Sequence, residues 1–268
     1  MNSENSATFG SSLRQWRKSR GLSQLELALT ADSSARHLSF LENGRALPSR
    51  AMVLRLAEAL DVPLRERNAL LAAAGFASMF RETPLDSGAM REVQRALRLM
   101  LNKQEPYPAL VIDRAWEIVE TNAACARLMA LLGVAEADGP LNLLRLMMHP
   151  NGMRQWVEDW EAGARMLLLQ LRRELAAAGN DATLGSLLEE VLGYPDVAAL
   201  QEIAPDARAM PVLPLTIARD SLRLSWFTTV TTFGTPQDIT MQELRIEMFY
   251  PADEATDRFS RELAANVH

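Results

Sequence analysis

The 268-residue sequence is poor in the residues and patterns on which several protein classes depend. Its single cysteine, Cys125, excludes an internal disulfide and a cysteine-rich zinc site, and it fits a reducing compartment. No stretch reaches the roughly 18 uncharged apolar residues of a membrane helix, and the first ten residues lack the pattern of a signal peptide. The sequence therefore predicts a cytoplasmic protein without a membrane partner.

Sequence patterns of common active sites are also missing. The three histidines, His37, His149 and His268, are far apart in the chain. There is no His-x-x-x-His, Gly-x-Ser-x-Gly, P-loop or Gly-x-Gly-x-x-Gly spacing. Carboxylates alone can form an active site, but no pair stands out. We therefore expect no enzyme, no metal and no cofactor, and we keep an enzyme fused to a DNA-binding domain as the least favoured alternative.

The net charge of −6 is unevenly distributed. Residues 1–82 carry 11 Lys and Arg against 8 Asp and Glu, whereas residues 83–268 carry 17 against 26. Within residues 9–55 the excess is 8 basic residues against 3 acidic ones. A positive field at one end of an acidic chain indicates a polyanionic partner for that end.

Residues 13–45 contain the signals of two short helices joined by a tight turn. Ser23 and Glu26 form a capping box, which predicts a helix from Gln24 to Ala31. Asp32 ends it, since Asp tolerates the left-handed conformation of such a turn. Ser33 or Ser34 then caps a second helix, with Leu38 and Leu41 inward and Arg36, Ser39, Phe40 and Asn43 outward. Two helices so joined are typical of the helix-turn-helix, whose second helix enters the major groove.

The segments GLSQLELA, HLSFLENGR and LPSR resemble the lambda-repressor-like, XRE-type helix-turn-helix domain. Further along, RLAEALDVPLRERNALLAAAGF, YPALVIDRAWEIVETN and TTVTTFGTPQDITMQELRIEMFYPAD resemble regulators with an MmyB-like ligand-binding domain. The resemblance implies a multidomain protein, with an all-α five-helix DNA-binding domain over residues 9–82. An α+β, PAS-like ligand-binding domain with an antiparallel sheet of about five strands is expected over residues 90–265.

The pattern after residue 90 agrees with a mixed domain. It predicts helices over 90–103, from Thr121 or Asn122 to 132, over 141–178 with a break near 149–152, over 184–192, and from Asp253 to 264. It predicts strands over 109–112, 116–119, 212–218, 222–233 and 239–250. Residues 81–88 carry proline, glycine and charges and are the expected linker.

Eight residues are candidates for DNA contacts: Gln24, Ser34, Ala35, Arg36, His37, Phe40, Asn43 and Arg45. Arg36 can bond the O6 and N7 edge of guanine, although a phosphate contact is the alternative, and Phe40 can cover a thymine methyl. His37 is as easily a packed residue, while Asn43 and Arg45 suit the DNA backbone. The resemblance implies a phosphate contact for Gln24 and an ion pair between Arg17 and Glu42, with solvated charges as the alternative.

The expected ligand is small and apolar, and by resemblance acyl-like or fatty-acid-like. Its candidate contacts are Trp116, Met147, His149, Trp156, Trp160, Phe227 and Thr229. Flexible thioethers and flat rings suit apolar cavities, although at helical and strand spacing each such residue is more often core. We expect a transcription regulator that binds a short palindromic operator as a homodimer. The alternative is a second domain that serves only dimerisation or protein interaction.

Overall fold

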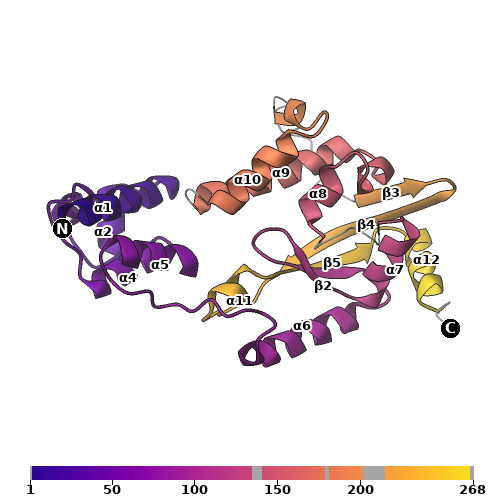
Figure 1. The fold of residues 1–268 in the computed structure, drawn as a ribbon, viewed down its shortest axis with the longest axis horizontal. Helices are drawn as coiled ribbons and strands as arrows, with labels where there is room; N and C mark the ends of the chain where they lie inside the picture. The colour runs from indigo at the N-terminus through magenta and orange to yellow at the C-terminus, as the bar shows by residue number, and fades with distance from the viewer. Residues whose placement is uncertain (1, 135–140, 179–180, 202–214, 266–268) are drawn as a thin grey trace. The chain divides into compact units, whose positions relative to one another are not determined.

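The computed structural model describes residues 2–134, 141–178, 181–201 and 215–265 (Figure 1). These residues form two compact units. The first consists of Met1–Thr83 together with Thr235–Gln242, and the second of Pro84–Gly234 and Glu243–His268. The sequence suggested two contiguous domains, whereas a short segment from late in the chain joins the first unit. Within the described ranges, no helix is long and apolar enough to cross a membrane.

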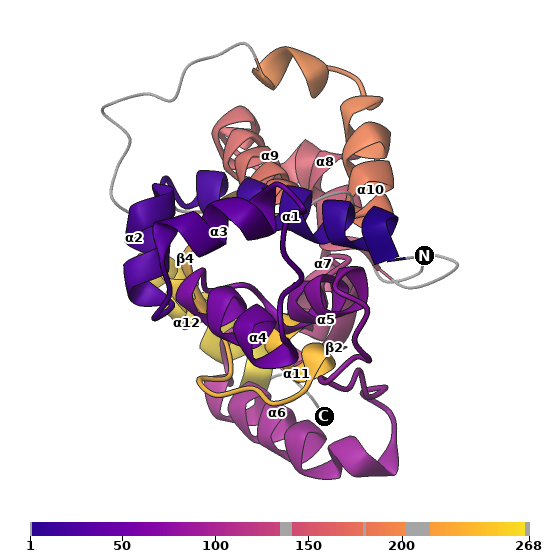
Figure 2. The same ribbon diagram turned by 90° about the vertical axis from the view of Figure 1, so that its left-hand side faces the viewer.

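The first unit contains the five helices that the sequence predicts, α1–α5, which Figure 2 shows together. They are α1 (Asn2–Ser19), α2 (Gln24–Thr30), α3 (Ala35–Glu42), α4 (Arg50–Ala59) and α5 (Leu64–Ala73). A further short helix, α11 (Ile239–Glu243), begins in the late segment. The α2–turn–α3 arrangement confirms the expected helix-turn-helix.

Apolar side chains at helical spacing hold these helices together. Phe9 and Leu13 of α1 and Leu38 and Leu41 of α3 are each 1% exposed or less, and burying each one contributes roughly 1.5–3 kcal/mol. Gly10 allows α1 to approach α3 closely, because a Cβ there would lie 2.5 Å from the carbonyl oxygen of Leu41. The back of α3 is thus fixed against α1.

The second unit is built on an antiparallel sheet in the order β2-β1-β5-β4-β3. Its strands are β1 (Ala109–Ile112), β2 (Ile118–Thr121), β3 (Leu215–Arg219), β4 (Leu222–Thr231) and β5 (Arg245–Pro251). Its α-helices are α6 (Arg91–Gln104), α7 (Ala123–Leu131), α8 (Leu143–Met148), α9 (Trp160–Ala177), α10 (Ala182–Leu192) and α12 (Glu254–Ala265). Short 3-10 turns occur at η1 (Gly88–Met90), η2 (Met153–Trp156) and η3 (Ala198–Gln201). The predicted α+β, PAS-like fold with five strands is confirmed.

Each face of the sheet is covered by its own set of helices (Figure 1). Leu110 and Ile112 of β1 and Leu224 and Trp226 of β4 belong to a large core shared with α7, α8, α9 and α10. On the other face, Val111 of β1 and Ile246 of β5 pack with Leu97 and Leu101 of α6. The period-two alternation of the strands therefore separates two cores.

Three expected elements differ from the structure. The strand predicted over 116–119 occupies Ile118–Thr121 instead, because Trp116 turns the chain with a φ of 65°. The last strand starts at Arg245 rather than at Ile239, because Asp238 accepts a bond from the N–H of Thr240 at 2.9 Å and starts helix α11 instead. The helix predicted over 141–178 has a second interruption, where Val157 bridges Ile217 and Asp159 has a φ of 47°. The predicted strand start at 212–214 lies outside the described residues.

Candidate nucleic-acid interface

The surface around α3 is shaped by two capped helices and a tight turn. Ser23 Oγ accepts a bond from Glu26 N at 3.2 Å, and Glu26 Oε2 accepts one from Ser23 N at 2.7 Å, which confirms the capping box. Asp32 turns the chain with a φ of 48°. Ser34 then caps α3 by accepting a bond from His37 N at 3.1 Å. Local capping therefore determines where α3 begins.

Glu42, at the end of α3, is the centre of a buried polar cluster. Its side chain is 0% exposed and that of Arg17 is 11% exposed. Arg17 donates from Nε to Oε1 at 2.6 Å and from Nη2 to Oε2 at 2.9 Å, so the expected ion pair is present. Oε2 also accepts bonds from Gln24 Nε2 at 2.9 Å and Arg14 Nε at 3.4 Å. Since the donors lie on α1 and α2, Glu42 joins three helices.

Hydrogen bonding keeps this cluster charged. Burial alone would raise the pKa of the Glu42 carboxyl, but the bonds from Arg17, Gln24 and Arg14 outweigh burial and hold that pKa below its ordinary value. The bond to Glu42 in turn raises the pKa of Arg17. Both groups are therefore ionised at neutral pH, and the back of α3 rests on a buried ion pair.

The outward side of α3 carries a cation held over an aromatic ring. Arg36 is exposed, and its Cζ lies 5.4 Å from the centroid of the half-buried Phe40 ring. Such a contact contributes about 0.5–1 kcal/mol at an exposed site. His37 beside them is half-buried. The Arg36 guanidinium and the Phe40 ring are therefore in contact on the outward side of α3, whereas their sequence positions predict only two separate DNA contacts.

The end of α3 is also occupied by protein contacts. Asn43 accepts a bond on Oδ1 from Arg14 Nη2 at 3.0 Å and donates from Nδ2 to the Ser39 carbonyl at 2.7 Å. Arg45 follows and is exposed. Sequence reasoning missed Arg14 as a member of this site. The signal was its spacing of three residues from Arg17, which places both side chains on one side of α1.

At the start of α3, Ser34 is exposed and Ala35 is half-buried. Both residues lie beside Arg36 at the N-terminus of α3. In a helix-turn-helix, the N-terminal residues of the second helix are the ones that contact base edges. Gln24, by contrast, lies on α2 and is half-buried. The residues predicted to contact DNA therefore lie at the start of α2, on α3 and directly after α3.

The residues predicted to hold a ligand are divided between the two faces of the sheet. Trp116, Met147 and Trp160 are buried in the large core. Trp116 Nε1 donates to Glu174 Oε2 at 2.9 Å, and Trp160 Nε1 donates to the Met147 carbonyl at 2.7 Å. Both indole N–H groups are thus satisfied within the protein. Trp156 packs against the same core, and its buried Nε1 has no partner in the described part of the chain.

The other predicted ligand residues do not join this group. His149 accepts a bond on Nδ1 from Asn151 N at 3.1 Å, and its ring meets Tyr194 edge-on at 5.0 Å. Phe227 stacks on Tyr250 with 5.4 Å between centroids, on the face of the sheet opposite Trp226. Thr229 is exposed on that same opposite face. The sheet therefore separates Phe227 and Thr229 from the tryptophan and methionine side chains.

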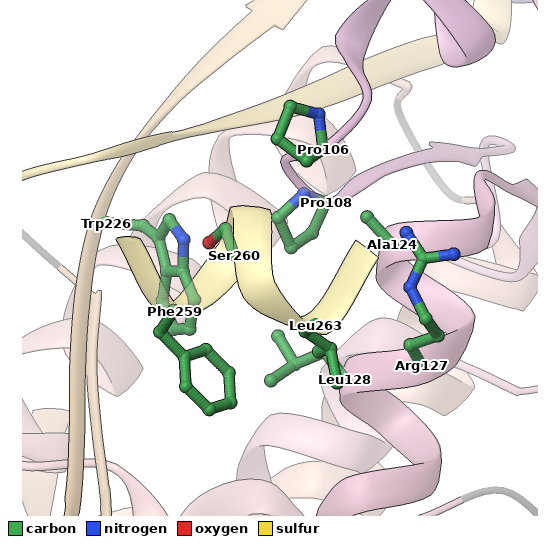
Figure 3. Close-up of a pocket in the computed structure, with 9 residues that line it drawn as sticks. All are labelled: Pro106, Pro108, Ala124, Arg127, Leu128, Trp226, Phe259, Ser260 and Leu263. Carbon is green, nitrogen blue, oxygen red and sulfur yellow. The ribbon is translucent and has the colours of Figure 1, made fainter. Parts of the chain in front are cut away.

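A small pocket lies elsewhere, between β4, α7, α12 and the loop before β1 (Figure 3). Apolar groups such as Pro108, Leu128 and Phe259 line most of it. Trp226 Nε1 and Arg127 Nε, which belong to two of its lining residues, are buried and have no hydrogen-bond partner among the described residues. Its volume of about 10 Å³ suits one water or one ligand oxygen. No sequence pattern marked this pocket, because its walls come from distant parts of the chain.

Comparison with known proteins agrees with this geometry. The model of the MmyB-like transcription regulator ligand binding domain matches residues 93–263. The chain belongs to this family. A helix-turn-helix family model matches residues 13–67, so the protein is a DNA-binding transcription regulator with a ligand-binding domain of the MmyB-like family.

A solved structure was also found, the crystal structure of the clp gene regulator ClgR from C. glutamicum. It is 28% identical, and the alignment covers 26% of this chain and 88% of that chain with a TM-score of 0.24. No curated protein matches the sequence.

Proposed function

We propose that residues 9–82 read duplex DNA through α3 and that residues 90–265 sense a small apolar, acyl-like molecule. One observation supports the first part most strongly. Leu38 and Leu41 are buried and Glu42 is anchored by three side chains, while Arg36 is exposed. A recognition helix needs this combination, because a rigid back holds the outward side chains at a fixed depth in the groove.

Two arginines take different roles in this proposal. Arg36, supported by Phe40, bonds the major-groove edge of guanine, and such a bond discriminates by about 1–3 kcal/mol. Arg45 contacts phosphate and adds affinity without sequence preference. Gln24 serves two functions, since an amide nitrogen has two N–H groups: one braces Glu42 and the other donates to phosphate.

Selection of bound sequences from random duplex DNA tests this division. Wild-type protein should enrich a short operator. Arg36→Ala should bind the selected and the random duplex with similar affinity, because base readout is lost. Arg45→Ala should weaken both duplexes alike and reduce the salt dependence. Equal losses on both duplexes for Arg36→Ala would refute the assignment of Arg36 to a base.

We further propose that the regulator acts in the cytoplasm as a homodimer on a palindromic operator, because one copy of α3 spans only a few base pairs. Light scattering of the protein with one or two half-sites tests this. A complex with one protein chain on a two-half-site duplex would contradict it.

For the effector we propose two positions. One is the core group around Trp116, Met147, Trp156 and Trp160. The other is the pocket at Trp226, whose volume of about 10 Å³ admits one oxygen of the ligand and not its whole chain. The pocket is favoured by its two unpaired N–H donors, since a buried donor without a partner costs roughly 1–3 kcal/mol. A carbonyl or carboxylate oxygen of a ligand is the kind of acceptor that each of these donors lacks.

The two positions can be distinguished by experiment. Solvent extraction of purified protein and thermal-shift screening with acyl compounds should identify an effector. Trp226→Phe should then weaken its binding if the pocket holds it, and Trp156→Phe if the core group does. No extractable molecule and no thermal shift would favour a second unit that serves only dimerisation or protein interaction.

A further inference from the structure

The segment Thr235–Gln242 connects β4 to β5, yet it belongs to the first unit together with residues 1–83. It lies within one of the stretches on which the family resemblance depends, and neither DNA reading nor ligand binding explains it. We call it the docking segment. Its contacts with the rest of the first unit are hydrogen bonds. In addition, the side chain of Ile239 is buried and only 2% exposed.

The first contact completes a helix. α5 begins after Pro63, which provides no side-chain cap, so the N–H groups of its first turn need acceptors from elsewhere. Gln242 Oε1 accepts the bond from Leu64 N at 2.7 Å. The N-cap acceptor of a helix in the DNA-binding unit is thus supplied by a residue about 180 positions later in the chain.

The second contact fixes the strand-like segment that follows α5. Ile239 N donates to the Arg81 carbonyl at 2.8 Å, and Arg81 and Asp238 form an isolated parallel bridge. Asp238 Oδ2 accepts a bond from Thr83 Oγ1 at 2.6 Å, and Oδ1 accepts one from Thr83 N at 3.3 Å. Four hydrogen bonds therefore hold the docking segment to residues 64–83.

The docking segment bonds to residues 81–83, and the residues just before them are held to α5 by the Asn68 side chain. Asn68 donates from Nδ2 to the Phe80 carbonyl at 2.8 Å, and its Oδ1 accepts bonds from Met79 N and Phe80 N at 2.9 and 3.1 Å. α5 itself packs against α1 and α4, and α1 packs against α3. A chain of contacts therefore leads from the docking segment to the helix that carries Arg36.

At its other end the docking segment is covalently continuous with the centre of the sheet. β5 is the middle strand, between β1 and β4. β4 and β5 pair from Trp226–Pro251 to Thr231–Ile246, so a change of register or twist in this pair must move residues 235–242. Trp226, which lines the small pocket, lies on the same strand β4.

From these contacts we infer that the docking segment couples the ligand-binding sheet to the DNA-binding helices, with Gln242 acting as a releasable N-cap of α5. The inference rests on the proposed function. A ligand acts through this element by binding unequally to the docked and the released state. By the reciprocity of linkage, DNA bound to the first unit must then also change the stability of β4 and β5.

Hydrogen exchange of the full-length chain tests the inference without an identified effector. In Gln242→Ala, exchange at Leu64 and the first turn of α5 should become about 2- to 30-fold faster, the factor that corresponds to loss of an N-cap. Gln237→Ala is the matched control, since Gln237 is an exposed glutamine of the same segment. Unchanged exchange in α5 of the Gln242→Ala variant would overturn the role of this cap.

A second experiment tests the coupling between DNA binding and the sheet. Binding of the duplex DNA enriched by selection should slow amide hydrogen exchange in β4 and β5 of the wild type and of Gln237→Ala. This slowing should be lost in a variant that combines Gln242→Ala with Thr83→Val, although fluorescence anisotropy shows that DNA still binds. Equal slowing in that variant, or none in wild-type protein with bound DNA, would overturn the inference. Failure of the wild type to bind any duplex would instead refute the proposed function, and the exchange of α5 would still test the cap.

Discussion

The buried Glu42 cluster gives the sharpest prediction about stability. Glu42→Gln removes the carboxylate but leaves Arg17 buried, and breaking a buried ion pair in this way costs roughly 3–5 kcal/mol. Small domains have about 5–15 kcal/mol in total. We therefore expect this variant to lose a large share of the unfolding free energy of the first unit, whereas Glu58→Gln on the exposed side of α4 should change it by under about 0.5 kcal/mol.

A double substitution separates charge burial from helix packing. Arg17→Met combined with Glu42→Leu removes both charges and fills the space with apolar groups, which is often neutral or stabilising. The double variant should recover most of the stability that Glu42→Gln loses. Urea unfolding, with hydrogen exchange of peptides from α1–α5 as the readout, measures the stability of the first unit in both variants. If the single and the double variant were destabilised alike, the unpaired charge of Arg17 would not be the cause of the stability loss in Glu42→Gln.

The same cluster predicts a pH dependence. The pKa of the Glu42 carboxyl is lowered in the folded protein, so its stabilising contribution is complete above its unfolded pKa of about 4.3. The contribution is lost as the pH falls from there through the lower folded pKa. Acid unfolding of α1–α5 should therefore be less steep in the double variant than in the wild type, and identical acid profiles would contradict the charged assignment.

Three further predictions concern packing and reactivity. Gly10→Ala should destabilise α1–α5 by at least about 1–3 kcal/mol, measured by urea unfolding, because the new Cβ would lie 2.5 Å from the Leu41 carbonyl; unchanged stability would mean that α1 shifts freely. Asn122→Ala should destabilise the second unit by roughly 2–5 kcal/mol in the same assay, since Asn122 bonds four backbone groups; a change under 1 kcal/mol would refute this role. Burial raises the pKa of the Cys125 thiol to about 12, so iodoacetamide at pH 8 should label it only after denaturation, and rapid labelling of native protein would contradict its burial.

Local signals in the sequence predicted much of the DNA-binding unit. The capping box at Ser23 and the left-handed Asp32 depend on neighbouring residues alone, and the structure has both. Of the two serines that the sequence offers as the cap of α3, Ser34 accepts the bond. In the second unit, Asn122 rather than Thr121 caps α7. The cluster at Glu42 was found only in part. Its Arg17 bond followed from the family resemblance, whereas the added bonds from Arg14 and Gln24 depend on how α1, α2 and α3 cross.

Contacts between distant residues were not predictable in this way. The sequence predicts that residues 239–242 of this segment begin the last strand, because nothing local shows that Asp238 starts a helix or that Gln242 caps α5. The separation of Phe227 from the tryptophans follows from the sheet faces, which require the register of β4 against β5. The small pocket at Trp226 likewise exists only once α7, α12 and β4 are assembled.

The most direct test of the central claim replaces single guanines of the selected operator by 7-deazaguanine, which removes the N7 acceptor from the major groove. We expect one such position to weaken wild-type binding by about 1–3 kcal/mol and to have little effect on Arg36→Ala, because both changes remove the same bond. Wild-type affinity that is unchanged at every position, or an equal loss in Arg36→Ala, would show that the outward side of α3 does not read bases.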